Sequence, residues 1–255
     1  MNQVFEGLRG LLGRAAEILL LILILVTLWQ VVHELAGAIA MTAPLDTFRY
    51  TARLVLSADF WPHVQVTGIA FFLALLIASA AGVVIGATLG LHRLSGEVGE
   101  PILVALYSIP KVTLYPIILM FFGLGLRAEV AFGALHGIVP IIILTMNAVR
   151  SIKPVYIRTA SVLRLSSWQL LRSILVRAAL PEIFTGLRVG FSVTLVGTLI
   201  SEMFGSKRGL GFLLMRSLGV HDMDLIMAIT LLLVMFAAIS NSILMSIENR
   251  LYRRV

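Results

Sequence analysis

The chain has 255 residues, of which 59% are hydrophobic and only 13% are charged. Soluble domains carry roughly 25% charged residues, so this composition predicts an integral membrane protein and excludes a soluble enzyme or a disordered chain. Cysteine is absent, which excludes a disulfide framework and a thiolate metal site. We attribute the net charge of +7 to lysine and arginine on the cytoplasmic side of a membrane, and we predict no nucleic-acid partner.

Six apolar stretches are long enough to cross a bilayer, which requires roughly 20 apolar residues per helix. Each stretch is continuous and not alternating, so helices are predicted rather than the strands of a barrel. Pro110 and Pro116 interrupt the third stretch. The predicted fold class is an all-α membrane protein with six transmembrane helices in a single transmembrane domain, residues 1–255. The predicted spans are Ala15–Ala36, Val66–Leu91, Pro101–Leu124, Ala128–Val149, Thr185–Phe204 and Leu225–Ile247.

Lysine and arginine are divided unequally between the two ends of these spans. If the N-terminus is cytoplasmic, thirteen of them lie on the cytoplasmic side, six lie outside, and Lys111 lies within the third span. Positive residues collect in cytoplasmic loops. We therefore predict a multi-pass protein of the cell inner (plasma) membrane, surrounded by lipid, with both termini in the cytoplasm.

Two outer segments carry local structural signals. Residues 41–65 are punctuated by polar residues and place Leu45, Phe48, Ala52 and Val55 on one helical face, which predicts a surface helix lying along the membrane. A tight turn is predicted at Gly123-Leu124-Gly125.

Small residues recur at intervals of four in the second span and again at the start of the fifth. This spacing places them on one helix face, where they permit close approach of a neighbouring backbone. The pattern predicts helix packing and carries no information about substrate. The residues are Ala78, Gly82, Gly86 and Gly90 in the second span, and Gly186 and Gly190 in the fifth.

The inner segment from Arg150 to Arg177 contains six basic residues and no acidic one, so it is too polar to span a membrane. Pro154 suits the first turn of a short helix, Val155–Leu163. Ser166-Ser167-Trp168-Gln169 fits a capping box that begins a second helix, which makes Arg164-Leu165-Ser166 a bend. Two interpretations remain open: a solvated basic loop, or an ordered surface that docks a soluble partner.

Sequence motifs for catalysis are missing. There is no P-loop, no HExxH zinc helix, no GxSxG elbow and no pair of acidic residues facing one cavity. We therefore predict no catalytic residue, no metal site and no cofactor bound by this chain.

Three residues are candidates for a translocation path. Lys111 lies deep in the third span, between the two prolines, where a charge is costly and broken backbone is tolerated beside a wet cavity. It either meets an anionic substrate or snorkels and pairs with a backbone carbonyl. Tyr115 follows in the same broken span. His136 in the fourth span is a path residue or a hydrogen-bonded packing residue.

Three stretches resemble a known family. RTASVLRLSSWQLLRSILVRAALPEIFTGLRVG, LISEMFGSKRGLGFLL and SIPKVTLYPIILMFFGLG are similar to the inner-membrane permeases of ABC importers. The similarity is to the branch that handles nitrate, taurine, aliphatic sulfonates and similar small anions. In that family a signature begins with Glu-Ala-Ala and has a glycine four positions later. Here the triplet falls on Arg158-Thr159-Ala160 and the glycine position on Arg164.

The resemblance implies a type I ABC importer permease that carries no chemical step itself. Its partners would be a second permease copy in a homodimer, two ATP-binding subunits that hold ATP and Mg, and an extracytoplasmic solute-binding protein. Residues 150–185 would be the coupling segment that docks on the ATPase. The residues implied to couple are Ala160, Leu163, Arg164, Leu165, Ser166, Ser167 and Trp168.

Two other functions are weighed against this one. An ion-coupled secondary transporter usually shows paired repeats with matching broken helices, but only the third span is broken here. An intramembrane enzyme needs paired ionisable groups in one cavity, and the sequence offers none. The substrate is expected to be a small anion such as a sulfonate, taurine or nitrate.

Overall fold

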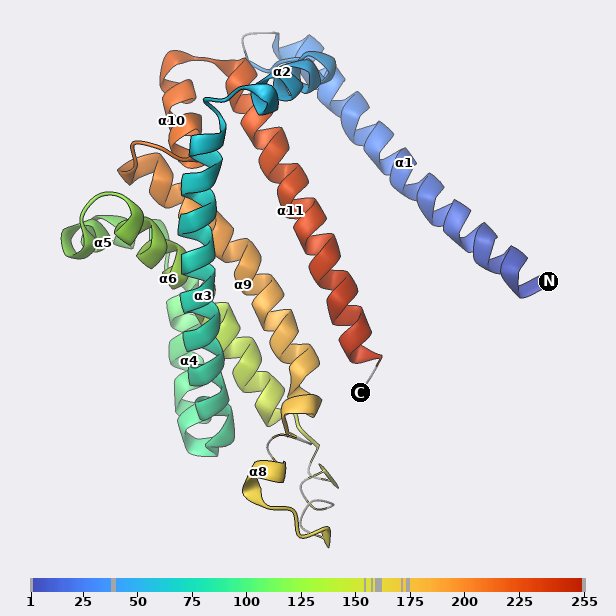
Figure 1. Cartoon of the computed structure of the whole chain (residues 1–255), viewed down its shortest axis with the longest axis vertical. Coiled ribbons are helices and arrows are strands. Elements are labelled where there is room, and N and C mark those ends of the chain that lie inside the picture. Colours follow the sequence, from blue (N-terminus) through green and yellow to red (C-terminus); the bar gives the residue numbers. More distant parts are fainter. Residues whose placement is uncertain are drawn as a thin grey trace. The chain divides into compact units, whose positions relative to one another are not determined.

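The computed structural model describes residues 2–37, 40–153, 155, 156, 158, 162–170, 172 and 175–253, without the side chains of residues 2–15, 167 and 168 (Figure 1). Within these residues the regular secondary structure is helical. Contacts divide the chain into two compact units. The first unit is Met1–Ser57 with Arg216–Leu232, and the second is Ala58–Met215 with Leu233–Val255.

The first unit contains the long helix α1 (Asn2–Ala36) and the shorter helix α2 (Pro44–Leu56). The indole N–H of Trp29 donates to the carbonyl of Thr42 at 3.0 Å, and its ring lies 6.5 Å from that of Phe48. The predicted helix is present as α2, and its position along the membrane surface stays a prediction. Its face with Thr47 and Thr51 is buried, while Leu45 and Phe48 stay exposed. An exposed apolar face on such a helix suits the boundary of a membrane.

The second unit is built on three packed helices, α3 (Trp61–Leu91), α6 (Leu126–Arg150) and α9 (Val176–Gly205). Their contacts occur at the predicted small residues. A Cβ added at Gly86 would lie 2.6 Å from the carbonyl oxygen of Ile142, and one at Gly190 would lie 2.5 Å from Cδ1 of Ile141. Only glycine permits such close packing, so the predicted role of these residues is confirmed.

The predicted third span is not one helix. It consists of α4 (Arg93–Ser108), the 3₁₀ turn η1 (Lys111–Leu114) and α5 (Tyr115–Phe122), with an 86° bend between the two parts (Figure 1). The break lies at Pro110 alone. The prediction that Pro116 also breaks the span is wrong, because Pro116 lies in the first turn of α5, where its missing N–H costs nothing.

Five described helices are long and apolar enough to cross a membrane, and the bent pair α4–α5 makes a sixth span if both parts count together. The remaining spans are α1, α3, α6, α9 and α11 (Met223–Tyr252). The predicted turn after α5 is present, with positive φ at Gly123 (71°) and Gly125 (95°), and the N–H of Gly125 donates to the carbonyl of Gly205.

Candidate functional site

The predicted capping box lies between α6 and α9 and is formed as expected. The backbone N–H of Ser166 donates to Oε1 of Gln169 at 2.9 Å, and the N–H of Gln169 donates to Oγ of Ser166 at 3.3 Å. These reciprocal bonds start the short helix α8 (Ser167–Leu170). They satisfy two backbone donors that the helix itself leaves unpaired, so the start of α8 is ordered by residues within one turn of it.

The bend before α8 is centred on Arg164, which has a φ of 49°. A left-handed conformation costs a non-glycine residue roughly 1–2 kcal/mol. The signature of the family that the sequence resembles has glycine at this position, and glycine adopts this conformation without steric cost. Arg164 therefore keeps the shape of the bend at a cost in conformational energy, and the predicted bend is confirmed.

Apolar side chains are displayed beside this bend. Val162 is 81% exposed and Leu163 is 64% exposed, while Leu165 is half-buried. Large apolar side chains are therefore exposed on an otherwise basic segment. Ala160 and part of the predicted helix Val155–Leu163 lie outside the described residues.

Polar contacts tie together the helix ends that flank the segment. Oγ of Ser151, just after α6, lies 2.9 Å from Oε2 of Glu182 on α9. Arg150 at the end of α6 forms a 2.7 Å ion pair with Glu100 on α4. The segment therefore begins and ends at helix ends that polar contacts join to one another and to α4.

Lys111 lies in η1, directly after the break at Pro110, and is half-buried. Its Nζ donates to the carbonyl of Tyr107 at 3.1 Å and lies 4.8 Å from the centre of the Tyr107 ring. Both contacts are to its own bend, because removal of regular helix bonds there leaves a carbonyl to accept from the ammonium group. The charge is thus held at the end of α4 and remains partly accessible.

Tyr115 and His136 are buried and lie against a residue that the sequence did not single out, Phe132. The ring of Phe132 is 5.0 Å from that of Tyr115 and 4.4 Å from that of His136. The hydroxyl of Tyr115 donates to the carbonyl of Ser201 at 2.9 Å, and Nδ1 of His136 lies 3.0 Å from the carbonyl of Phe132. These contacts hold α5 and α6 against α9.

A buried carboxylate at the end of α9 was also missed. Glu202 is fully buried, and its Oε2 accepts from Oγ1 of Thr67 at 2.9 Å and from the N–H of Gly211 at 2.8 Å. Oγ1 of Thr67 in turn accepts from the N–H of Leu210 at 2.8 Å. Side chains from α3 and α9 thus cap the start of α10 (Leu210–Val220). The sequence signal that could have found it is an acidic residue near the end of an apolar stretch.

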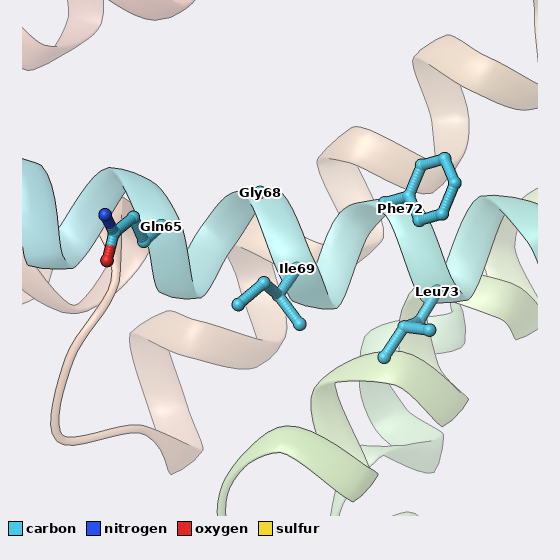
Figure 2. A pocket seen from close by; sticks show the side chains of 5 residues that line it. All are labelled: Gln65, Gly68, Ile69, Phe72 and Leu73. Atoms are coloured by element: carbon cyan, nitrogen blue, oxygen red, sulfur yellow. The ribbon is translucent and has the colours of Figure 1, made fainter.

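Two hollows in the second unit have mainly apolar linings. One groove of about 430 Å³ runs along α3, where Ile69 and Leu73 project to the same side (Figure 2). A larger one, of about 710 Å³, lies among α3, α5 and α6 and includes Leu73 and the charged Arg127 in its lining. These surfaces suit lipid tails or another apolar helix better than a small anion.

The comparisons with known proteins decide the family. The profile described as "Binding-protein-dependent transport system inner membrane component" matches residues 78–255. The chain belongs to this family. It is therefore a multi-pass inner-membrane permease, the membrane subunit of an ATP-driven ABC importer, as the resemblance of its sequence implied. The matched range contains the capping box, the bend and all three path candidates.

Two relatives span most of this permease. The putative aliphatic sulfonates transport permease protein SsuC of Bacillus subtilis (strain 168) is 24% identical over 237 residues, covering 92% of this chain and 86% of its own. The taurine transport system permease protein TauC of Escherichia coli (strain K12) is 27% identical over 196 residues, covering 77% and 71%.

The fold has a solved counterpart. An inward-facing structure of the MetNI methionine ABC transporter aligns with a TM-score of 0.64 and 17% identity, over 76% of this permease and 99% of that chain. The likeness confirms the type I importer permease fold.

Proposed function

We propose that this permease forms the translocation path of an importer for a small anion such as a sulfonate, taurine or nitrate. It works as a homodimer with two ATP-binding subunits and receives its solute from an extracytoplasmic binding protein. ATP and Mg²⁺ bind on the partner ATPase. The observation that carries the proposal is the ordered bend at Arg164, which displays Leu163 beside a formed capping box in a binding-protein-dependent family.

The coupling segment, residues 150–185, transmits the ATPase cycle in this proposal. Docked ATPase subunits grip the bend, including Trp168 on α8, and move it when ATP binds. Because the flanking helix ends are joined through Ser151–Glu182 and Arg150–Glu100, the movement reaches several spans at once. Rigid-body motion of packed helices is a common route to alternating access.

The anionic substrate is supported by two facts. The relatives named for aliphatic sulfonates and taurine handle anions or zwitterions with a sulfonate group. Lys111 supplies a partly accessible positive charge at the bend of α4–α5. In this proposal Lys111 meets the solute, while Tyr115 and His136 hold the walls of the path in position.

The test is reconstitution in proteoliposomes with the cognate ATP-binding subunit and solute-binding protein. We expect uptake of labelled taurine, an alkanesulfonate or nitrate that requires ATP, Mg²⁺ and the binding protein. Uptake that is indifferent to ATP contradicts the importer. ATP-driven uptake of a neutral solute alone contradicts the substrate class and leaves the importer intact.

Both termini lie in the cytoplasm in this proposal, which places the turn after α9 outside. The chain has no cysteine, so the labelling of a single introduced cysteine shows on which side of the membrane that residue lies. Lys207→Cys, at an exposed position, should react with an impermeant thiol reagent on intact cells, whereas Arg93→Cys should react only after lysis. The reverse pattern contradicts this orientation.

A further inference from the structure

The C-terminal half of α11 has an unusual way of attaching to the second unit. From Leu233 to Arg253, Glu248 is the only buried residue. Large apolar side chains in this stretch, such as Val234, Ile239 and Ile243, are exposed. This half of α11 therefore buries a carboxylate against the neighbouring helix, while its apolar side chains stay exposed on the surface of the unit.

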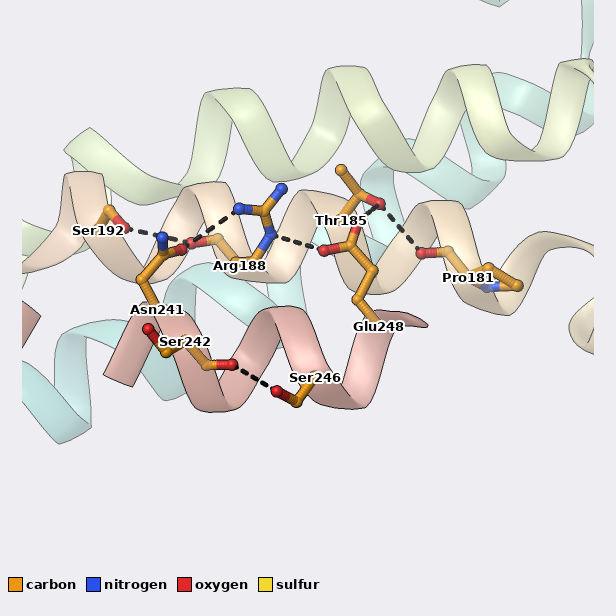
Figure 3. Close-up of polar contacts among 8 residues, drawn as sticks. All are labelled: Pro181, Thr185, Arg188, Ser192, Asn241, Ser242, Ser246 and Glu248. Carbon is orange, nitrogen blue, oxygen red and sulfur yellow. Dashed lines mark hydrogen bonds and ion pairs between the residues drawn. The ribbon is translucent and has the colours of Figure 1, made fainter. Parts of the chain in front are cut away.

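The neighbour is α9, and the contacts form a polar cluster of four side chains, Thr185, Arg188, Asn241 and Glu248, which we name the α9–α11 clamp (Figure 3). Nε of Arg188 lies 2.7 Å from Oε2 of Glu248. Oγ1 of Thr185 donates to Oε1 of the same carboxylate at 2.5 Å, and Nη1 of Arg188 donates to Oδ1 of Asn241 at 3.2 Å. Both carboxylate oxygens of Glu248 are thus engaged from α9.

The geometry of the clamp fixes how α11 lies on α9. Asn241 and Glu248 are seven residues apart, about two helical turns or roughly 10 Å, and Arg188 reaches both. A shift of α11 by one residue rotates these side chains by about 100° and breaks the contacts. The rings of Phe191 and Phe236, 6.2 Å apart, add one apolar contact above the cluster.

Polar contacts matter more here than they would in water. Lipid tails are as apolar as leucine, so exposed apolar residues on α11 provide little force toward α9, and hydrogen-bonding groups hold the helices together. A buried ion pair adds little net stability compared with an apolar pair, but it specifies one arrangement. The clamp is therefore better suited to setting position than to raising stability.

The clamp is also placed to receive motion from the coupling segment. Thr185 and Arg188 lie nine and twelve residues after Val176, the first residue of α9. Glu182, three residues before Thr185, joins α9 to the end of α6 through Ser151. Movement of the segment thus enters α9 directly, while the C-terminal half of α11 meets that movement through the clamp.

We propose that the α9–α11 clamp makes the C-terminal half of α11 follow α9 during the transport cycle, so that Arg188 and Glu248 are positioning residues for the change of access. The proposal rests on the proposed function, since it needs an ATPase that moves the coupling segment. The two ideas are separable because the wild-type complex tests the function and the clamp variants test the clamp.

The experiment measures ATP hydrolysed per solute transported in the reconstituted full complex. Glu248→Gln and Arg188→Gln should keep ATPase binding and hydrolysis while transport falls, which raises the ratio several-fold. Glu97→Gln is the matched control, because it breaks an ion pair whose Arg93 partner is largely exposed on α4; its ratio should equal the wild-type value. An unchanged ratio in the clamp variants overturns the proposal.

Two further variants separate positioning from stability. Arg188→Leu with Glu248→Met removes both charges, so no buried charge is left unpaired and assembly should recover; the ratio should stay high. Recovery of coupling in this double variant means a structural role only and overturns the proposal. Thr185→Val keeps the ion pair and the side-chain volume, so this variant can be tested even if the charge variants do not assemble. It should raise the ATP hydrolysed per solute transported by a smaller factor than the charge variants.

A distance measurement tests the motion itself. Spin labels at Val196→Cys on α9 and Val234→Cys on α11, both exposed positions, can be placed in the cysteine-free chain. In the wild-type complex the distance between labels should be the same without nucleotide and with ATP trapped. In the Glu248→Gln complex the distribution should broaden or shift with ATP. Equal distributions in both proteins contradict the clamp.

Discussion

Leu163 offers a quantitative test of ATPase docking. Its side chain is 64% exposed beside the bend at Arg164. Full burial of a leucine side chain contributes roughly 1.5–3 kcal/mol, so covering the exposed part contributes about 1–2 kcal/mol. Leu163→Ala should therefore weaken binding of the ATP-binding subunit roughly 5- to 25-fold, since about 1.4 kcal/mol corresponds to a factor of ten.

The assay is titration of the purified ATP-binding subunit onto the permease in lipid nanodiscs, read by fluorescence anisotropy. Leu124→Ala is the matched control, because Leu124 is 73% exposed in the turn between Gly123 and Gly125, on the opposite side of the membrane from the segment in the proposed topology. Its Kd should equal that of wild type. Equal Kd values for Leu163→Ala and wild type, or equal weakening in both variants, refute the assignment of the docking surface.

Three more outcomes are expected. Gly86→Ala should lower the free energy of unfolding in an SDS titration by about 1–3 kcal/mol through overpacking against Ile142, whereas Gly68→Ala, with open space around its Cβ, should raise it by up to about 1 kcal/mol. Arg164→Gly should relieve about 1–2 kcal/mol of left-handed strain and leave transport at or above the wild-type rate; loss of ATPase binding would contradict this. Lys111→Met should reduce uptake of an anion at least tenfold with normal assembly, while Lys111→Arg should retain most of the wild-type uptake. If the two variants take up the anion at the same rate, the charge of Lys111 has no role in the path.

The sequence predicted the spans because hydropathy reports the part of each helix inside hydrocarbon. The helices themselves are longer: α3 begins at Trp61 and not at Val66, and α9 begins at Val176 and not near Thr185. Helices continue past the hydrocarbon where hydropathy no longer marks them. The error at Pro116 arose because a proline within an apolar stretch predicts a helix break. A proline in the first turn of a helix is well accommodated, and Pro116 occupies that position in α5.

The candidate site was predictable only where its signal is local. The capping box joins residues three positions apart, so the sequence alone specifies both partners of each bond. Glu202 and Thr67 are 135 residues apart, and no local pattern connects them. The pairing of Arg188 with Glu248 depends in the same way on how α9 and α11 meet, which hydropathy does not encode.

The helix contacts of the second unit divide into two physical kinds. Between α3, α6 and α9, glycine and alanine let backbones approach closely, and dispersion over many atoms provides most of the contact, to which the bond from Thr67 to Glu202 adds one buried polar link. Such contacts resist separation because every shift opens a void. The contact of α9 with the C-terminal half of α11 relies instead on one ion pair and two hydrogen bonds. The clamp contacts depend on a few polar atoms, whereas α3, α6 and α9 pack over many, so we expect a single substitution in the α9–α11 clamp to change coupling before it changes folding.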